Sequence, residues 1–330
     1  MQNQQKTKIE WLSILQGWSM LLVVIGHVVL TDNMFDDKYP MSSYLYQIIY
    51  SFHMALFIFI SGWLLYYTSI AKNKSFKTVI KSKVKRLLIP FYAFTIFTIL
   101  IKLLLAQYVK RPVDVNEIIE TFILYSSNPL KELWFIVVLF VMMLGYPLYV
   151  YMIKTVYREI FMLVLGVLLF LFSPNNIHVF FFHKFIYLYF FFILGIITAH
   201  HRIIEKINLP VIGGISLCLF IAFNVLNTAD VGWLGLINRL TGILFSICLC
   251  LFLSRRLPSL FSSFRDYTFQ IYLVGMFPQM VLRVWFLNSD LDSMYGVLFF
   301  TSIVIGIYIP VFISRVLKKY PTVLNPCLGL

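Results

Sequence analysis

Two apolar stretches decide the fold of this chain: residues 9–30, IEWLSILQGWSMLLVVIGHVVL, and residues 50–63, YSFHMALFIFISGW. Both lie in apolar runs close to the roughly 20 residues that a helix needs to cross a bilayer. Each contains a histidine. An ionisable side chain at membrane depth is costly, so it normally faces a cavity or a partner. His27 and His53 are therefore candidates for a functional site. The alternative is that each imidazole only bonds a neighbouring helix.

Gln16 lies 11 positions before His27 in the first stretch. At roughly 100° per residue, this separation is three full turns plus about 20°, so the two side chains share one face of a helix. The first predicted helix therefore carries an amide deep in the membrane and an imidazole near its outer end.

The composition sets the broad class of the protein. The chain is 60% hydrophobic and 12% charged, against about 25% charged residues in a typical globular domain. Its mean hydropathy is +0.86. A soluble protein of this composition could not cover its surface with polar groups, so we predict a polytopic membrane protein. The four cysteines have no metal-ligand spacing, and no set of His, Cys or acidic residues predicts a metal site.

The apolar runs predict an all-α bundle of about ten transmembrane helices in a single membrane domain over residues 1–330. The predicted spans are 11–30, 46–67, 88–108, 133–153, 159–173, 179–199, 209–226, 233–253, 267–287 and 295–317.

The charged residues predict the orientation of these spans. If the N-terminus is cytoplasmic, the inner segments hold 19 of the 27 Lys and Arg residues, and the outer segments hold ten of the 14 acids. Because Lys and Arg concentrate on the inner side, both termini are predicted to be cytoplasmic, in a multi-pass protein of the plasma (inner) membrane. The same distribution accounts for the net charge of +13, because the Lys and Arg residues gather on the inner side of the lipid bilayer. A nucleic-acid partner is not needed to explain the charge.

The longest outer connection covers residues 109–132. Asp114 followed by Glu117 is a capping-box pattern, and apolar residues follow at helical spacing. We expect a short amphipathic helix at the outer interface.

A basic run, residues 77–90 with sequence KTVIKSKVKRLLIP, precedes the third predicted span. It is consistent with the positive-inside signal or with a patch that binds anionic lipid. It is also consistent with a clamp for the phosphates of a nucleotide-bearing donor, because Lys and Arg are the groups that bind phosphate.

Polar residues interrupt the later spans as well. Arg239 and Arg283 fall inside the eighth and ninth spans, where they either pair with cavity-lining groups or extend to the interface. Phe277-Pro278-Gln279 predicts a kink in the ninth span. His201 and Glu205 are spaced for a contact on one helix face.

Several stretches, in this order, resemble the integral-membrane acyltransferase family 3, and in particular its polysaccharide O-acetyltransferase branch. The resemblance covers essentially the whole chain. It rests on Ile9–Gly17 with Leu22–His27, Ser51–Gly62, Lys83–Pro90, Leu133–Phe135, Tyr189–Gly195 and Gln270–Leu273.

The chain departs from the family pattern at several of these positions. It has Gln16 and Lys83 where the family usually has arginine, Ala55 where proline is common, and Gly275 where histidine is frequent. Glutamine can donate a hydrogen bond to a thioester carbonyl but supplies no charge.

The resemblance implies an enzyme that transfers an acyl group, most simply acetyl, from acetyl-CoA as co-substrate to a sugar hydroxyl of a cell-surface polysaccharide or lipid-linked sugar. In this interpretation Lys83 and Arg86 bind the coenzyme A phosphates, and the pantetheine arm runs along the Gln16 face. His27 acts as general base or carries the acyl group transiently, since a neutral imidazole suits either role. His53 orients the acceptor or stabilises the oxyanion.

A different class of function is also compatible with the sequence. A transporter or exporter of polysaccharide or acyl groups needs no bond-making chemistry, and the missing arginine and Gly275 favour it. A family member that acts only as a scaffold is the third interpretation.

Overall fold

The computed structural model describes residues 2–28, 40–104, 133–173, 179–206, 208–227, 232–287, 294–320 and 325–330, with the single positions 118, 122 and 289. Within these ranges the regular elements are all helices, which confirms the all-α class. The amphipathic helix predicted within 109–132 lies outside the described residues.

The helices form two compact units, each built from segments that are distant in the sequence. The first unit comprises Met1–Phe57 and Lys206–Tyr320, and the second comprises Ile58–Glu205 and Pro321–Leu330. The helix α3 (His53–Leu65) begins in the first unit and continues in the second. The prediction of a single domain over 1–330 remains a prediction.

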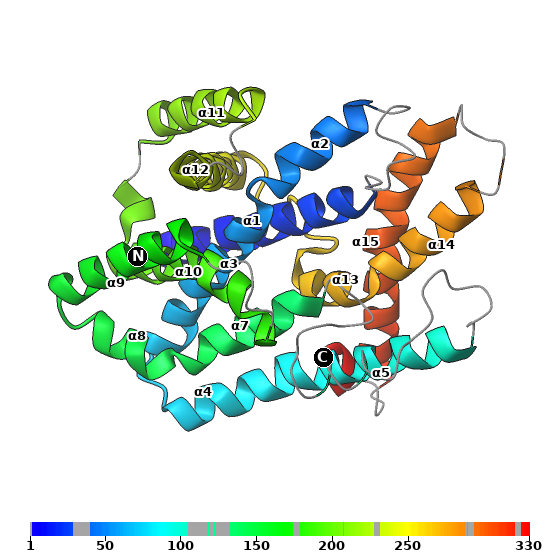
Figure 1. Cartoon of the computed structure of the whole chain (residues 1–330), viewed down its shortest axis with the longest axis horizontal. Coiled ribbons are helices and arrows are strands. Elements are labelled where there is room, and N and C mark those ends of the chain that lie inside the picture. The colour runs from blue at the N-terminus through cyan, green and yellow to red at the C-terminus, as the bar shows by residue number, and fades with distance from the viewer. Residues whose placement is uncertain are drawn as a thin grey trace. The chain divides into compact units, whose positions relative to one another are not determined.

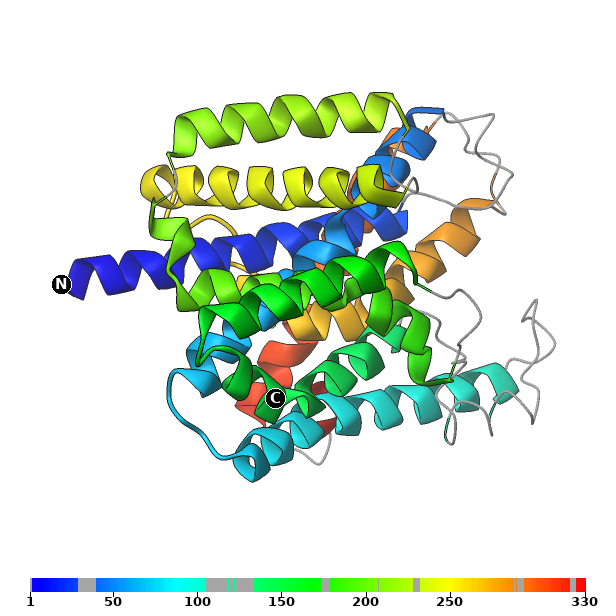
Figure 2. The same cartoon turned by 60° about the vertical axis from the view of Figure 1, so that its left-hand side comes forward.

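The first unit is organised around the N-terminal helix α1. Its helices are α1 (Gln2–Val28), α2 (Pro40–Tyr50), α11 (Leu209–Val225), α12 (Gly232–Arg256), α13 (Thr268–Val274), α14 (Met276–Leu287) and α15 (Tyr295–Lys319), with the short η8 (Arg265–Tyr267). In Figure 2, α11, α12 and α1 run side by side. On its other side α1 contacts α13, α14 and α15.

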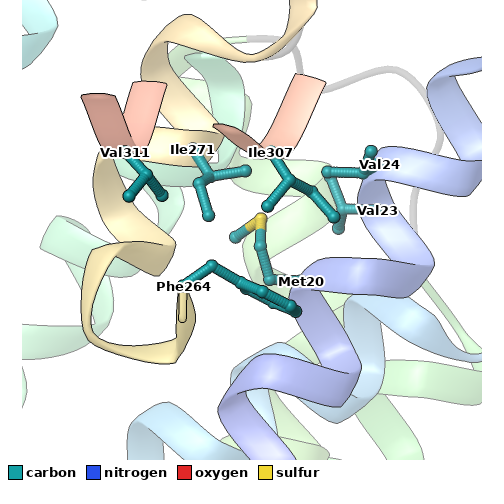
Figure 3. Packing of buried hydrophobic residues seen from close by; sticks show 7 residues of the cluster. All are labelled: Met20, Val23, Val24, Phe264, Ile271, Ile307 and Val311. Carbon is teal, nitrogen blue, oxygen red and sulfur yellow. The ribbon is translucent and has the colours of Figure 1, made fainter. Parts of the chain in front are cut away.

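The core of this unit forms where α1, α13 and α15 meet. Figure 3 shows the side chains that converge there: Met20, Val23, Val24, Phe264, Ile271, Ile307 and Val311. All seven are buried, so removing any of them leaves a cavity that costs transfer free energy as well as lost packing. This packing holds the second half of α1 against the C-terminal helices.

The second unit carries the basic run. Its helices are η1 (Tyr66–Ile70), α4 (Phe76–Lys83), η2 (Val84–Leu88), α5 (Ile89–Leu104), α7 (Trp134–Leu144), α8 (Tyr146–Met152), α9 (Val156–Leu171), η6 (Val179–Phe181), α10 (Phe182–His200), η7 (Ile203–Lys206) and η10 (Pro326–Leu328). Figure 1 shows α4 continuing into α5 along one line, and η2 between them is a π-helical turn. Such turns are frequent at functional sites.

Two glycines in the second unit bring α3 and α10 together. A methyl group added at Gly62 would collide with the carbonyl oxygen of Phe192, and one added at Gly195 would collide with that of Phe59. Small residues that allow close backbone approach are typical of helix pairs in membranes.

Among the residues that the structure describes, six helices are long and apolar enough to cross a membrane, and a bent pair counted as one span makes seven. The six are Glu10–Val28, Tyr44–Ile70, Phe76–Leu104, Val179–His200, Gly232–Arg256 and Tyr295–Lys319, and the bent pair is Trp134–Leu144 with Tyr146–Met152, at 53°. Helices also cover the remaining predicted spans, but α9 and α11 are shorter and the ninth span is divided. The count of ten and the cytoplasmic termini remain predictions.

The ninth predicted span is broken at Gly275, between α13 and α14. Pro278 then lies in the first turn of α14. The backbone N–H groups of a first turn have no partner within the helix, so the N–H that proline lacks costs no hydrogen bond there. The interruption lies three residues before Pro278, and the kink predicted at Phe277-Pro278-Gln279 remains a prediction.

Large apolar side chains face outward on several helices. Phe161 on α9 is 65% exposed, and Phe300 and Phe312 on α15 are 70% and 68% exposed. Apolar surface of this extent is characteristic of helices that contact lipid, so the chain is a membrane protein.

Candidate active site

His27 lies in the last turn of α1, one residue before the helix ends. The last carbonyls of a helix have no intrahelical partner, and two side chains of α14 bind them here. Arg283 donates from Nη2 to the carbonyl oxygen of His27 at 2.8 Å. Gln279 donates from Nε2 to the carbonyl oxygen of Val24 at 3.2 Å and also to that of Ser302. The histidine backbone is therefore fixed by a helix that begins about 250 residues later in the chain.

His53 is the first residue of α3, and its side chain is buried, with 3% exposed. Its Nδ1 lies 2.8 Å from the carbonyl oxygen of Ile49, in the last turn of α2. Because a carbonyl only accepts, Nδ1 carries the hydrogen, and in a neutral ring Nε2 is left as the acceptor. The ring of Tyr50 packs edge-on against the imidazole, with centroids 4.6 Å apart.

The structure brings the two predicted histidines together. Gly26 allows α1 to approach the end of α2, since a Cβ at this position would lie 3.0 Å from the Tyr50 ring and 3.4 Å from Ile49. The imidazoles of His27 and His53 are close enough to interact electrostatically.

Gln16 lies in the same unbroken helix as His27, so the predicted alignment along one face of α1 is retained. Its side chain is half-buried. Gly17 beside it packs against Phe261. No hydrogen bond joins the Gln16 amide to another residue in the described ranges.

Lys83 and Arg86 lie in the second unit, where α4 passes into the π-helical turn η2. Lys83 is half-buried and Arg86 is exposed. Lys83 is close enough to Arg86 and Lys74 for the like charges to interact. Three cations held near one another favour an anion among them.

Lys74 also lines a cavity of about 300 Å³ in this unit, together with Ile70, Asn73, Phe76, Tyr146, Pro147 and Val150. The hydroxyl of Tyr146 donates to the carbonyl oxygen of Lys74 at 2.6 Å and fixes this turn. The cavity volume is at the lower end of the range for small-molecule sites. Lys74 is the basic residue that lines this cavity, and Lys83 and Arg86, the residues predicted to bind phosphate, are not among its lining residues.

Sequence reasoning did not identify Tyr50 or Ile49 as parts of the histidine site, nor the carbonyl of His27 as the partner of Arg283. Arg283 was recognised only as a charge inside a span. The sequence also does not indicate that Glu159 is the partner of His200 and His201, because Glu159 lies 41 and 42 positions before these two histidines.

These features define an all-helical membrane protein in which two histidines, at the end of α1 and the start of α3, lie within electrostatic range of each other. The family model described as an acyltransferase domain, family 3, matches residues 9–315. The chain belongs to this family, and it is an acyltransferase. This assignment favours the enzyme over the transporter alternative. Searches of curated proteins and of solved structures found no significant match.

Gly275, which departs from the family pattern, has a packing role. A Cβ at this position would lie 2.6 Å from the carbonyl oxygens of both Gly306 and Ile271. The close contact between α13 and α15 leaves no room for the histidine that is frequent in the family.

Proposed function

We propose that the protein is a plasma-membrane O-acyltransferase that moves an acetyl group from cytoplasmic acetyl-CoA to a hydroxyl of a sugar in a polysaccharide or its lipid-linked precursor. The observation that supports it most is the pair of imidazoles, with the Nδ1 of His53 committed to Ile49. Acyl transfer to a hydroxyl needs a base that takes the hydroxyl proton, and imidazole is the commonest such group.

The hydrogen bond to Ile49 refines the role of His53. In the neutral ring Nε2 can accept a hydrogen bond but cannot donate one. An oxyanion needs donors, so a neutral His53 does not serve as the oxyanion stabiliser that the sequence analysis considered. It accepts a hydrogen bond either from the sugar hydroxyl or from His27, and in both cases it orients the group that reacts.

The donor is proposed to bind through its phosphates and its pantetheine arm. Lys74, Lys83 and Arg86 supply cations, and charge-assisted bonds from Lys and Arg to phosphate are among the stronger polar contacts. The Gln16 amide, on the same helix as His27, can donate to the thioester carbonyl or hold the amides of the arm.

In the proposed reaction the sugar oxygen attacks the thioester carbonyl carbon while His27 takes the hydroxyl proton. The C–S bond then breaks, and the proton passes to the thiolate to give free coenzyme A and the O-acetyl ester. A route with a transient acyl-imidazole at His27 gives the same products in two steps.

The test uses purified full-length protein in nanodiscs with acetyl-CoA carrying a labelled acetyl group. Polysaccharide extracted from cells that lack the protein serves as acceptor. We expect label in base-labile ester on the polysaccharide, with stoichiometric release of thiol. His27→Ala should abolish both while the variant remains membrane-inserted, and His183→Ala serves as the control. Full transfer by His27→Ala overturns the assignment of His27, and absence of thioester consumption by the wild type overturns the donor.

A further inference from the structure

A second group of ionisable side chains lies in the second unit and has no role in the proposed reaction. Glu159 stands in the first turn of α9, His200 is the last residue of α10, and His201 is its C-cap. We call these three residues the Glu159 cluster. In Figure 1, α9 and α10 lie side by side, in agreement with their extensive contact.

Each oxygen of the Glu159 carboxylate faces a different imidazole. Nδ1 of His200 lies 2.8 Å from Oε1, and Nε2 of His201 lies 2.6 Å from Oε2. One ligand atom from each of the three residues can be chosen so that all lie within 4.8 Å of one another. Ligand atoms about 2.1 Å from a tetrahedral zinc ion are roughly 3.4 Å apart, so small side-chain rotations suffice to enclose an ion.

The surroundings hold these side chains in place. Arg202 has a left-handed φ of 51°, which ends α10 and turns the chain directly after the two histidines. The two imidazoles pack against each other with centroids 4.7 Å apart, and the ring of Tyr66 lies 5.4 Å from that of His200. Arg158, next to Glu159 in the sequence, is engaged elsewhere, with its guanidinium 3.7 Å from the centre of the Tyr151 ring. Arg202, next to His201, lies within electrostatic range of Tyr66.

Exposure differs across the cluster in the way that an ion site requires. The Glu159 side chain is 4% exposed, whereas those of His200 and His201 are 30% and 39% exposed. The carboxylate forms the closed side of the site. The imidazoles leave an open side through which an ion can enter and where water can complete the coordination.

We propose that the Glu159 cluster binds a zinc ion through one carboxylate and two imidazoles, with water as the remaining ligand. Two nitrogen ligands and one oxygen ligand, with one position open, suit zinc better than the oxygen-preferring Mg²⁺ or Ca²⁺. The ion replaces the protons that the imidazoles share with the carboxylate, and it ties the start of α9 to the end of α10. This site is independent of the proposed acyl transfer.

The test is zinc binding by the full-length protein, purified with an affinity tag that contains no histidine. After titration with Zn²⁺ against a chromophoric chelator, we expect one zinc per chain. Glu159→Gln, His200→Gln and His201→Gln should each weaken binding at least about tenfold, since losing even an outer-shell partner typically costs 10–100-fold. Glu205→Gln and His183→Gln are matched controls, because they remove similar side chains from outside the cluster.

A second measurement does not depend on loss of binding. His201→Cys replaces an imidazole by a thiolate, so its Co²⁺ complex should gain a sulfur-to-metal charge-transfer absorption that the wild-type complex lacks. A wild-type chain that binds no zinc overturns the proposal. Zinc affinity that is equal in the wild type and in all three Gln variants overturns it as well, because the ion would then lie elsewhere.

Discussion

Arg283 donates a hydrogen bond from Nη2 to the backbone carbonyl oxygen of His27, at 2.8 Å. The bond joins a cation inside α14 to the last turn of the helix that carries the proposed base. It satisfies a carbonyl that the end of α1 leaves without an intrahelical partner. It also keeps a positive charge near the imidazole, since the two groups interact electrostatically. Arg283 is therefore a positioning residue for His27.

Replacing this arginine should impair catalysis more than donor binding. In Arg283→Met the His27 carbonyl loses its partner, at a cost of about 1–3 kcal/mol, and the last turn of α1 is no longer held. We expect kcat to fall by about tenfold or more with a smaller change in the KM for acetyl-CoA, and Arg283→Lys to recover part of the loss. Arg265→Met is the control, because Arg265 also donates to backbone carbonyls, but to those of Pro258 and Leu260 and not to that of a histidine. Equal kcat values for the two Met variants would remove the positioning role.

Two substitutions of His53 separate its structural role from its chemical role. In His53→Asn the amide nitrogen stands near the position of Nδ1 and can still donate to Ile49, but no group replaces Nε2. We expect this variant to keep the wild-type unfolding temperature and lose acyl transfer. His53→Ala should lose both, because the buried carbonyl of Ile49 is left unpaired. If His53→Asn transfers acetyl at the wild-type rate, the imidazole serves only to cap α2.

The proposed role of the basic residues near η2 can be tested by measuring the KM for acetyl-CoA. Lys83→Gln and Arg86→Gln each remove a proposed phosphate contact, worth about 1.5–3 kcal/mol for hydrogen bonds to charged groups. That corresponds to a rise of roughly 10–100-fold in the KM for acetyl-CoA. Lys81→Gln is the control, because Lys81 is exposed and its position two residues from Lys83 places it on another face of α4. An unchanged KM in both variants would show that the basic run does not bind the donor. The run would then serve to orient the protein in the membrane or to bind anionic lipid.

The sequence was sufficient for the features that depend on local pattern. The apolar runs predicted where helices occur, and the spacing of Gln16 and His27 predicted a shared helix face because α1 is continuous. Pro278 predicted a kink in the ninth span, because proline lacks the N–H that a helix interior needs, and the helix is interrupted close to it, at Gly275. What local pattern could not give was the partner of each polar side chain.

Those partners come from residues that are distant along the chain. Arg283 reaches His27 across 256 positions, and Glu159 reaches His200 across 41. Metal-ligand spacing along the sequence does not reveal the Glu159 cluster, because Glu159 lies on α9 and the two histidines lie at the end of α10. The pairing of His201 with Glu205, chosen from spacing alone, missed the carboxylate that the packing of α9 on α10 brings to it. Gly275 was interpreted as a lost functional group, although its position against Gly306 shows a steric requirement.

The close approach of α3 and α10 at Gly62 and Gly195 provides a test of the packing in the second unit. A methyl group at either position meets a carbonyl oxygen of the opposing helix, which cannot move aside as a flexible side chain would. Gly62→Ala and Gly195→Ala should therefore be destabilised by about 1–3 kcal/mol, although alanine is intrinsically favoured over glycine in a helix by roughly 1 kcal/mol.

Gly214→Ala is the matched control, because Gly214 lies in α11 with open space around its Cα, and it should unfold at the same temperature as the wild type or higher. Thermal unfolding of the three purified variants in one detergent, followed by tryptophan fluorescence, gives the comparison. Unfolding temperatures for Gly62→Ala and Gly195→Ala that match that of Gly214→Ala would show that α3 and α10 are not in backbone contact there.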